Sequence, residues 1–124
     1  MNLKWLFIPL SLTTATIALA YEDLENPTVK ARMMAMTTLV ENMRTLGGMA
    51  KGVVVFDLEQ AKAALADIES IAKTVPRLFE SDETHPKSEA LPMIWTNFVD
   101  FTAKSEALEN AAAQALANFS AKDD

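Results

Sequence analysis

Apolar residues recur in sevens along the first long segment of the chain, which is the spacing of a helix that buries one face in a bundle. We expect this helix to begin at Asn26-Pro27, a capping side chain followed by the residue best tolerated at the first helical position. Lys51-Gly52 is expected to end it. Its two apolar rows are Val29, Met36, Met43 and Ala50, and Met33, Val40 and Gly47.

A second helix is predicted to start at Asp57, because Gln60 follows three residues later as in a capping box. Pro76 is expected to end it. The short apolar run 53–56 before it is interpreted as a connector, since no second run is present to pair with it as a strand. The seam of the second helix comprises Leu58, Ala61, Leu65, Ile68, Ala72 and Val75.

A connection over 76–92, rich in Pro, Ser, Asp and Glu, follows and holds the only histidine, His85. Its length favours a function or a structural crossover. A third helix is predicted from Thr96 or Asn97 onward. Its rows are Phe98, Ser105, Ala112 and Phe119, and Phe101, Leu108 and Ala115.

Three amphipathic helices joined in this order predict an all-α, antiparallel bundle of the four-helix type with three helices present and the fourth missing. The sequence finishes in a polar stretch, 120–124, that is more typical of a turn. An open seam would expose an apolar patch that favours self-association. We therefore expect an incomplete bundle that can form a homodimer.

The composition narrows the possible functions. The chain has 124 residues, half of them apolar, and a net charge of −6. Such a surface repels nucleic acid and anionic lipid. The sequence holds no cysteine, so these residues can form no disulfide, thiol nucleophile, zinc-thiolate site or thioether-linked haem.

Residues 1–20 have the pattern of a secretory signal peptide: Lys4, an apolar stretch, then Ala18-Leu19-Ala20 before Tyr21. The apolar stretch is shorter than the roughly 20 residues that span a bilayer. Cleavage after Ala20 is favoured over an uncleaved anchor. This predicts a periplasmic domain over 21–124, with no membrane contact after cleavage.

No enzyme motif is present. The sequence has no Gly-rich phosphate loop, no histidine at a helical metal spacing and no nucleophile elbow. Glu106 and Glu109 share a helix face, but spaced carboxylates without an accompanying histidine are ordinarily solvated. We expect a protein that is not an enzyme.

Several short motifs occur in the order found in cytochromes c′, which the chain resembles over about residues 24–124. They are Arg32-Met33-Met34-Ala35-Met36, Lys51-Gly52 with Phe56-Asp57, Pro76-Arg77-Leu78-Phe79 and Leu91-Pro92-Met93-Ile94-Trp95. The resemblance implies a periplasmic four-helix bundle, usually a homodimer. In that family the fourth helix carries a Cys-x-x-Cys-His motif that attaches haem c and ligates its iron. This sequence ends before such a motif, so covalent attachment is not possible in this chain.

The resemblance implies a haem pocket formed by Arg32, Met33, Met36 and Glu89. Arg32 matches an arginine that contacts a haem propionate, a role suited to a planar guanidinium; the alternative is a solvated helix arginine. Met33 stands where the family often has glutamine. Met36 matches the bulky residue that shields the sixth coordination position, and a core or lid role is favoured over ligation. Glu89 aligns with a loop position near the haem.

His85 lies in the sequence Thr84-His85-Pro86, which is typical of a loop tip, where a rigid ligand geometry is difficult to build. Ligation of a non-covalent haem by His85 is therefore disfavoured. Trp95, Phe98 and Phe101 are expected to fill the core, with contact to a haem face as the alternative.

By resemblance, the protein is expected to bind haem and iron and to serve electron transfer or the binding of a small gas such as nitric oxide. A small redox protein or a diatomic gas would then be its partner. The alternative is a haem-free helical remnant that dimerises through its exposed seam.

Overall fold

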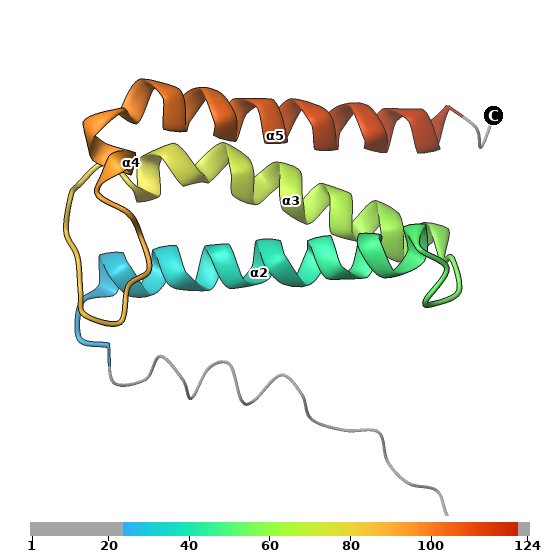
Figure 1. The fold of residues 1–124 in the computed structure, drawn as a ribbon. Coiled ribbons are helices and arrows are strands. Elements are labelled where there is room, and N and C mark those ends of the chain that lie inside the picture. Colours follow the sequence, from blue (N-terminus) through green and yellow to red (C-terminus); the bar gives the residue numbers. More distant parts are fainter. Residues whose placement is uncertain (1–23, 122–124) are drawn as a thin grey trace, which may run out of the picture.

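The computed structural model describes residues 24–121 and is helical throughout, apart from its connections. Three long helices, α2 (Pro27–Ala50), α3 (Leu58–Leu78) and α5 (Phe98–Ser120), lie roughly antiparallel, and a single-turn helix, α4 (Met93–Thr96), precedes α5. Figure 1 shows α3 between α2 and α5. The predicted all-α bundle is confirmed. The predicted signal peptide and the last three residues, 122–124, lie outside the described part.

The first two helices begin where their capping residues predict. The Asn26 side chain accepts a hydrogen bond from the Val29 N–H at 3.1 Å, with Pro27 at the first helical position. The Asp57 side chain accepts from the Gln60 N–H at 2.9 Å. Each bond satisfies one of the amide groups that a helix leaves unpaired at its start. Gly52 adopts a positive φ of 69° just after α2, which favours glycine.

The core lies along α3, which packs against both other long helices. Its buried residues are Ala61, Ala64, Leu65, Ile68, Ala72 and Val75. Leu39 and Leu46 of α2 and Leu108, Ala115, Leu116 and Phe119 of α5 pack against this centre. The predicted seam of α3 is thus confirmed from Ala61 to Val75, and most of that of α5 is confirmed as well. None of the helices in residues 24–121 combines the length and apolar character needed to cross a bilayer.

The prediction for the seam of α2 is wrong in part. Val40 and Met43 are 49 % and 53 % exposed, while Leu39 and Leu46, which are in neither predicted row, pack on the core. The reason is that the backbone of α2 approaches α3 but not α5 in the described part of the chain. Val40 and Met43 therefore face the open side between α2 and α5, whereas Val29, from the same predicted rows, is buried as predicted.

One predicted boundary is corrected at the far end of the bundle: helix α3 continues through Pro76 to Leu78. The third long helix begins at Phe98 with Asn97 as its N-cap, as predicted, and a single turn of helix, α4, comes before it. A proline inside a helix removes a donor from the ladder. Here the carbonyl of Ala72, four residues earlier, accepts a 2.7 Å hydrogen bond from the buried Ser105 hydroxyl of α5. Tertiary packing thus offsets part of the proline's effect.

Candidate functional site

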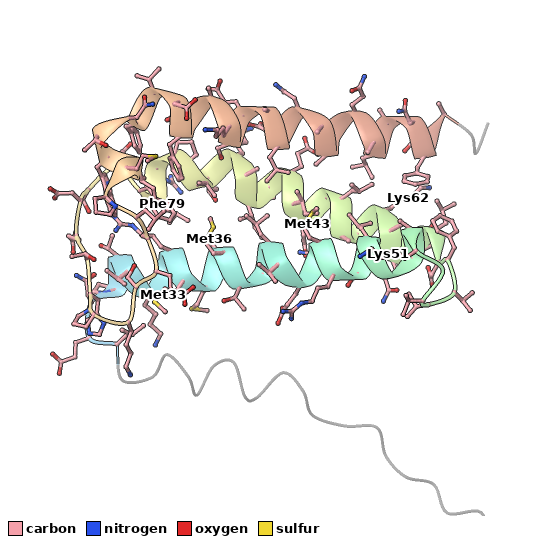
Figure 2. All side chains as sticks on the ribbon, in the orientation of Figure 1. Met33, Met36, Met43, Lys51, Lys62 and Phe79 are labelled. Carbon is pink, nitrogen blue, oxygen red and sulfur yellow. The ribbon has the colours of Figure 1, made fainter. Side chains whose placement is uncertain are left out.

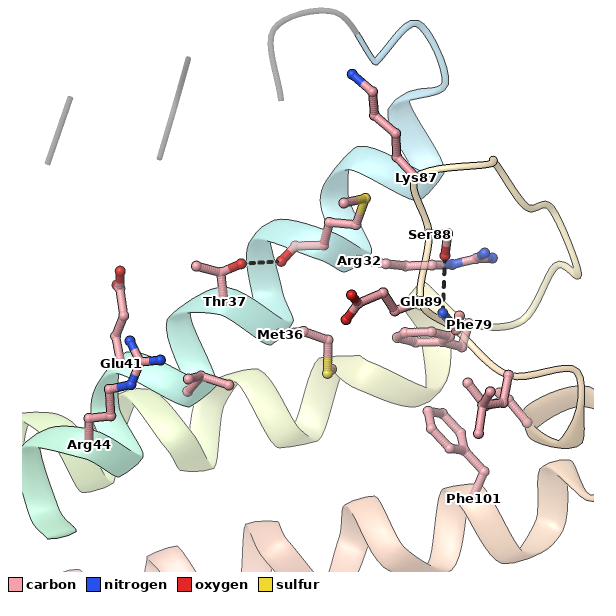
Figure 3. Close-up of a pocket in the computed structure, with 15 residues that line it drawn as sticks. Arg32, Met36, Thr37, Glu41, Arg44, Phe79, Lys87, Ser88, Glu89 and Phe101 are labelled. Carbon is pink, nitrogen blue, oxygen red and sulfur yellow. Dashed lines mark hydrogen bonds between the residues drawn. The ribbon is translucent and has the colours of Figure 1, made fainter. Parts of the chain in front are cut away.

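A cavity of about 780 Å³ opens at the end of the bundle where the connection 79–92 crosses between α3 and α4. Figure 3 shows it between α2, the connection and the start of α5. Most of its wall is apolar, with charged side chains at the margin. Its lining residues are Arg32, Met33, Met36, Thr37, Val40, Glu41, Arg44, Phe79, Lys87, Ser88, Glu89, Ala90, Leu91, Ile94 and Phe101.

All four residues predicted to form a pocket line this one cavity. Arg32 and Met33 are neighbours on one turn of α2, Met36 lies on the next turn, and Glu89 comes from the connection. Glu89 is distant in sequence from the other three and meets them because the connection folds back against α2. The structure therefore brings the predicted set together, and the contact of each residue with haem remains a prediction.

The aromatic wall of the cavity is continuous with the core at this end of the bundle. Phe79 and Phe101 line the cavity, with ring centroids 5.1 Å apart. Phe98 packs on Phe101 at 5.9 Å, and Trp95 packs on Phe79 at 6.4 Å. Aromatic pairs at such distances stabilise the packing of this wall. Of the predicted aromatic residues, Phe101 alone faces the cavity, and Trp95 and Phe98 support it from behind.

Met36 presents its thioether to the cavity from α2. Figure 3 shows its sulfur directed into the space between α2 and the other helices. Met33, Met36 and Met43 follow one another along α2 (Figure 2), but Met43 does not line the cavity. The unbranched methionine side chain adapts readily to a planar or irregular partner.

The side chain of Arg32 is 3 % exposed, so the solvated alternative is wrong. Its guanidinium donates to three backbone carbonyls: Nε to Leu78 at 2.5 Å, Nη1 to Glu83 at 2.6 Å and Nη2 to Ser81 at 2.5 Å. A fourth bond joins Nη2 to the Ser81 hydroxyl at 3.0 Å. Burial lowers the pKa of Arg32, and the carboxylates of Glu83 and Asp82 act in the opposite direction.

The hydrogen bonds continue from Arg32 to the start of α2. The Ser81 hydroxyl donates to Glu83 Oε1 at 2.9 Å, and Asn26 Nδ2 donates to Glu83 Oε2 at 2.7 Å. These two bonds, first the one from Asn26, lower the pKa of the Glu83 carboxyl, with smaller help from Thr28 and the Arg32 charge. Two points of the connection are thus bonded to α2.

Trp95 ties the two ends of the connection together. Its Nε1–H donates to the backbone carbonyl of Phe79 at 2.9 Å. Compact loops whose ends lie close together often carry a binding surface. The segment Lys87–Leu91, which forms one wall of the cavity, is contained within this closed loop.

His85 does not line the cavity. Its Nδ1 accepts a 3.1 Å hydrogen bond from the Lys87 amide, and its carbonyl accepts a 2.8 Å bond from the Ser88 amide. These bonds form a local turn in the connection, which agrees with the predicted loop-tip position. Within residues 24–121, no group of three or more His, Cys, Asp or Glu side chains could hold a metal ion.

Several lining residues were not predicted. Thr37, Val40, Glu41 and Arg44 continue the face of α2 that carries Met33 and Met36, at helical spacings of three and four. That spacing could have identified them. The contributions of Lys87 and Ile94 depend on the path of the connection, which leaves no periodic signal in the sequence.

Comparisons with known proteins relate the chain to one group of cytochromes. The family model described as "Cytochrome C'" matches residues 27–124. The chain is 38 % identical over 90 residues to cytochrome c-556 of Agrobacterium tumefaciens (strain B2A), covering 73 % of each protein. It is 34 % identical over 90 residues to cytochrome c-554 of Cereibacter sphaeroides, covering 69 % of this chain and 59 % of the relative. No solved structure gives a significant match.

Proposed function

The chain belongs to the cytochrome c′ family of haem-binding electron carriers, and on that premise we propose that its cavity holds a haem through non-covalent contacts. The convergence of Arg32, Met33, Met36 and Glu89 on one cavity is the observation that supports this proposal. The family implies haem c, but the sequence has no cysteine to form a thioether bond. The haem would therefore be released when the protein unfolds.

The cavity suits a porphyrin in size and chemistry. Its volume of about 780 Å³ lies in the upper part of the usual range for cofactor pockets, roughly 300–1,000 Å³. Met36, Phe79 and Phe101 supply apolar surface for a flat ring, and Arg44 and Lys87 supply positive charge at the margin. Carboxylate substituents on such a ring can be held by cations at the rim while the ring itself is buried.

Met36 is the side chain that we propose to approach the iron. Methionine is a known haem ligand in cytochromes, and no histidine or cysteine of residues 24–121 lines the cavity. The sulfur already points into the cavity (Figure 3). These two observations favour ligation over the purely steric role that the sequence suggested.

The haem would supply a one-electron iron couple, and the protein's part is to bind and shield it. The aromatic wall of Phe79 and Phe101 would shield one side of the bound haem from water. The open side between α2 and α5 leaves an edge accessible to a small redox partner or a diatomic gas. A buried ring with one accessible edge is suited to electron transfer. The surroundings that exclude water set the reduction potential of the iron, and the accessible edge is where a partner can approach.

The proposal is tested by adding haemin to the purified, haem-free protein and following the visible absorption. We expect saturable binding with a Soret band, which Ala90→Trp weakens by about tenfold or more because the indole fills the cavity. Ala107→Trp, on an exposed turn of α5 outside the cavity, serves as the matched control and should bind haemin as the original protein does. Equal binding by both variants would place haem elsewhere.

A second proposal concerns self-association through the open side. Val40 and Met43 are half exposed on α2, and apolar side chains gathered on one face often mark an interface. Sedimentation should show a dimer that Met43→Lys dissociates without loss of helical content. A monomer at every concentration would exclude this second function.

Proteins of this family are typically periplasmic. We propose that this protein is also exported, with residues 1–20 as its signal peptide and cleavage after Ala20. The amino-terminal sequence of the protein recovered from the periplasm tests this directly, since it should begin at Tyr21.

A further inference from the structure

We propose that Arg32 is a positioning residue that fixes the connection 79–92 against α2 and so shapes the cavity, rather than a residue that binds the carboxylates of the ligand. Four hydrogen bonds join its guanidinium to Leu78, Ser81 and Glu83. A guanidinium has five N–H donors. Little of its hydrogen-bonding capacity is left for a ligand, and the ligand part of this inference rests on the proposed haem function.

The chemistry of the contact requires arginine. The three nitrogens of the planar group reach three carbonyls that lie in different directions along residues 78–83. Lysine carries the same charge on a single nitrogen and cannot reproduce this fork. A lysine at position 32 would therefore keep the positive charge but could not join the three carbonyls as the guanidinium does.

One of the three carbonyls belongs to the end of a helix. Leu78 is the last residue of α3, and the final carbonyls of a helix have no partner within it. A cation there satisfies such a carbonyl and opposes the negative end of the helix dipole. Arg32 thus holds the exact point at which the chain leaves α3 and enters the connection.

The position of the cavity wall depends on this junction between α3 and the connection. The Arg32 guanidinium carbon lies 5.0 Å from the ring centre of Phe79 and 5.5 Å from that of Trp95. Phe79 lines the cavity, and Trp95 closes the connection through the Phe79 carbonyl. Residues Lys87–Leu91 follow within the same loop and form the facing wall. Releasing Arg32 should loosen both parts of the wall together.

If Arg32 serves the loop, other cations must meet the carboxylates of a bound ligand. Lys87 and Arg44 also line the cavity. Arg44 is exposed on α2 and Lys87 on the connection. This assignment makes Lys87→Gln a matched comparison, since it removes a cation from the same cavity without touching the Arg32 hydrogen bonds.

The first test needs no haem. Hydrogen exchange of the haem-free protein should show amides of residues 79–91 exchanging about tenfold faster or more in Arg32→Lys, with α5 unchanged, because bonds to a charged donor are lost. Ser81→Ala removes one acceptor of Arg32 together with the hydroxyl's bond to Glu83 but leaves the three carbonyl contacts, and should give a smaller acceleration in the same segment. If Arg32→Lys does not fold, the Ser81→Ala result decides. Unchanged exchange in the variants that fold overturns the inference.

The second test compares haemin with its dimethyl ester, which lacks free carboxylates. Arg32→Lys and Arg32→Gln should weaken binding of both compounds by the same factor, whereas Lys87→Gln should weaken binding of haemin only. If the Arg32 variants lost affinity for haemin but not for its dimethyl ester, and their amide hydrogen exchange were normal, Arg32 would bind carboxylates and the inference would be overturned. If the original protein binds neither compound, the haem proposal fails, and the exchange experiment still decides the positioning role.

Discussion

At the scale of single residues, Glu83 joins α2 to the connection through an exposed carboxylate. It accepts hydrogen bonds from Asn26 and Ser81, which lower its pKa in the folded protein. A carboxyl whose folded pKa lies below its unfolded value stabilises the protein above the unfolded pKa, and loses that contribution as the pH falls through the folded pKa.

We therefore predict that Glu83→Gln lowers the free energy of unfolding at neutral pH, and that the difference from the original protein vanishes in acid. The relevant window begins near the ordinary glutamate pKa, about 4.3, and extends below it. Urea unfolding at a series of pH values measures this. Glu80→Gln, a change in a neighbouring exposed glutamate, is the control, and a difference that persists unchanged into acid would contradict the account.

Met36 gives the second prediction at this scale. Leucine is close to methionine in volume, so Met36→Leu preserves a steric contact while removing the sulfur. If the thioether ligates the iron, Met36→Leu changes the spin-state bands of the haemin complex, and Met33→Leu, from the same cavity, does not. An unchanged spectrum in Met36→Leu would restore the steric role that the sequence favoured.

At the scale of secondary-structure elements, α3 and α5 are joined by a polar contact in the core. Pro76 lacks the N–H that would bond to the Ala72 carbonyl, and the Ser105 hydroxyl donates to that carbonyl at 2.7 Å. The residue that would ordinarily break a helix is thus accommodated by a neighbouring helix. Because the bond is buried, it also fixes how α3 and α5 meet.

This contact predicts an energetic coupling between two helices. Ser105→Ala should cost about 1–3 kcal/mol, because it leaves a buried carbonyl without this donor. In a Pro76→Ala background the backbone N–H of residue 76 is restored, so the same change should cost less, by at least about 0.5 kcal/mol. Chemical denaturation of the four proteins measures the cycle, and strictly additive effects would refute the coupling.

The elements also show what could be predicted and what could not. Caps at Asn26 and Asp57 and the seam of α3 follow from local hydrogen bonding and periodicity, and the structure confirms them. The predicted end of α3 at Pro76 is wrong because the donor that proline lacks is replaced by the Ser105 hydroxyl of α5. The predicted seam of α2 is wrong in part because periodicity identifies an apolar face without identifying the element that packs on it. At the candidate site, the α2 residues were accessible to sequence reasoning, whereas the tether at Arg32 depends on the three-dimensional path of the connection.

At the scale of the whole molecule, α3 holds the bundle together while α2 and α5 stand apart on either side (Figure 1). The cavity occupies one end of the open side, where the connection closes over it. Stability and binding are thus served by different parts of the molecule: the α3 core supplies the first, and the tethered connection supplies the wall for the second. The central claim is that the cavity beside this wall binds a haem.

The measurement that tests this claim most directly is the visible absorption spectrum of the protein purified from cells supplied with haem, before and after denaturation. The account predicts a Soret band in the native protein that is lost from the chain on denaturation, because no cysteine is present to attach the haem. A folded, helical protein that shows no Soret band and does not acquire one with added haemin would contradict it.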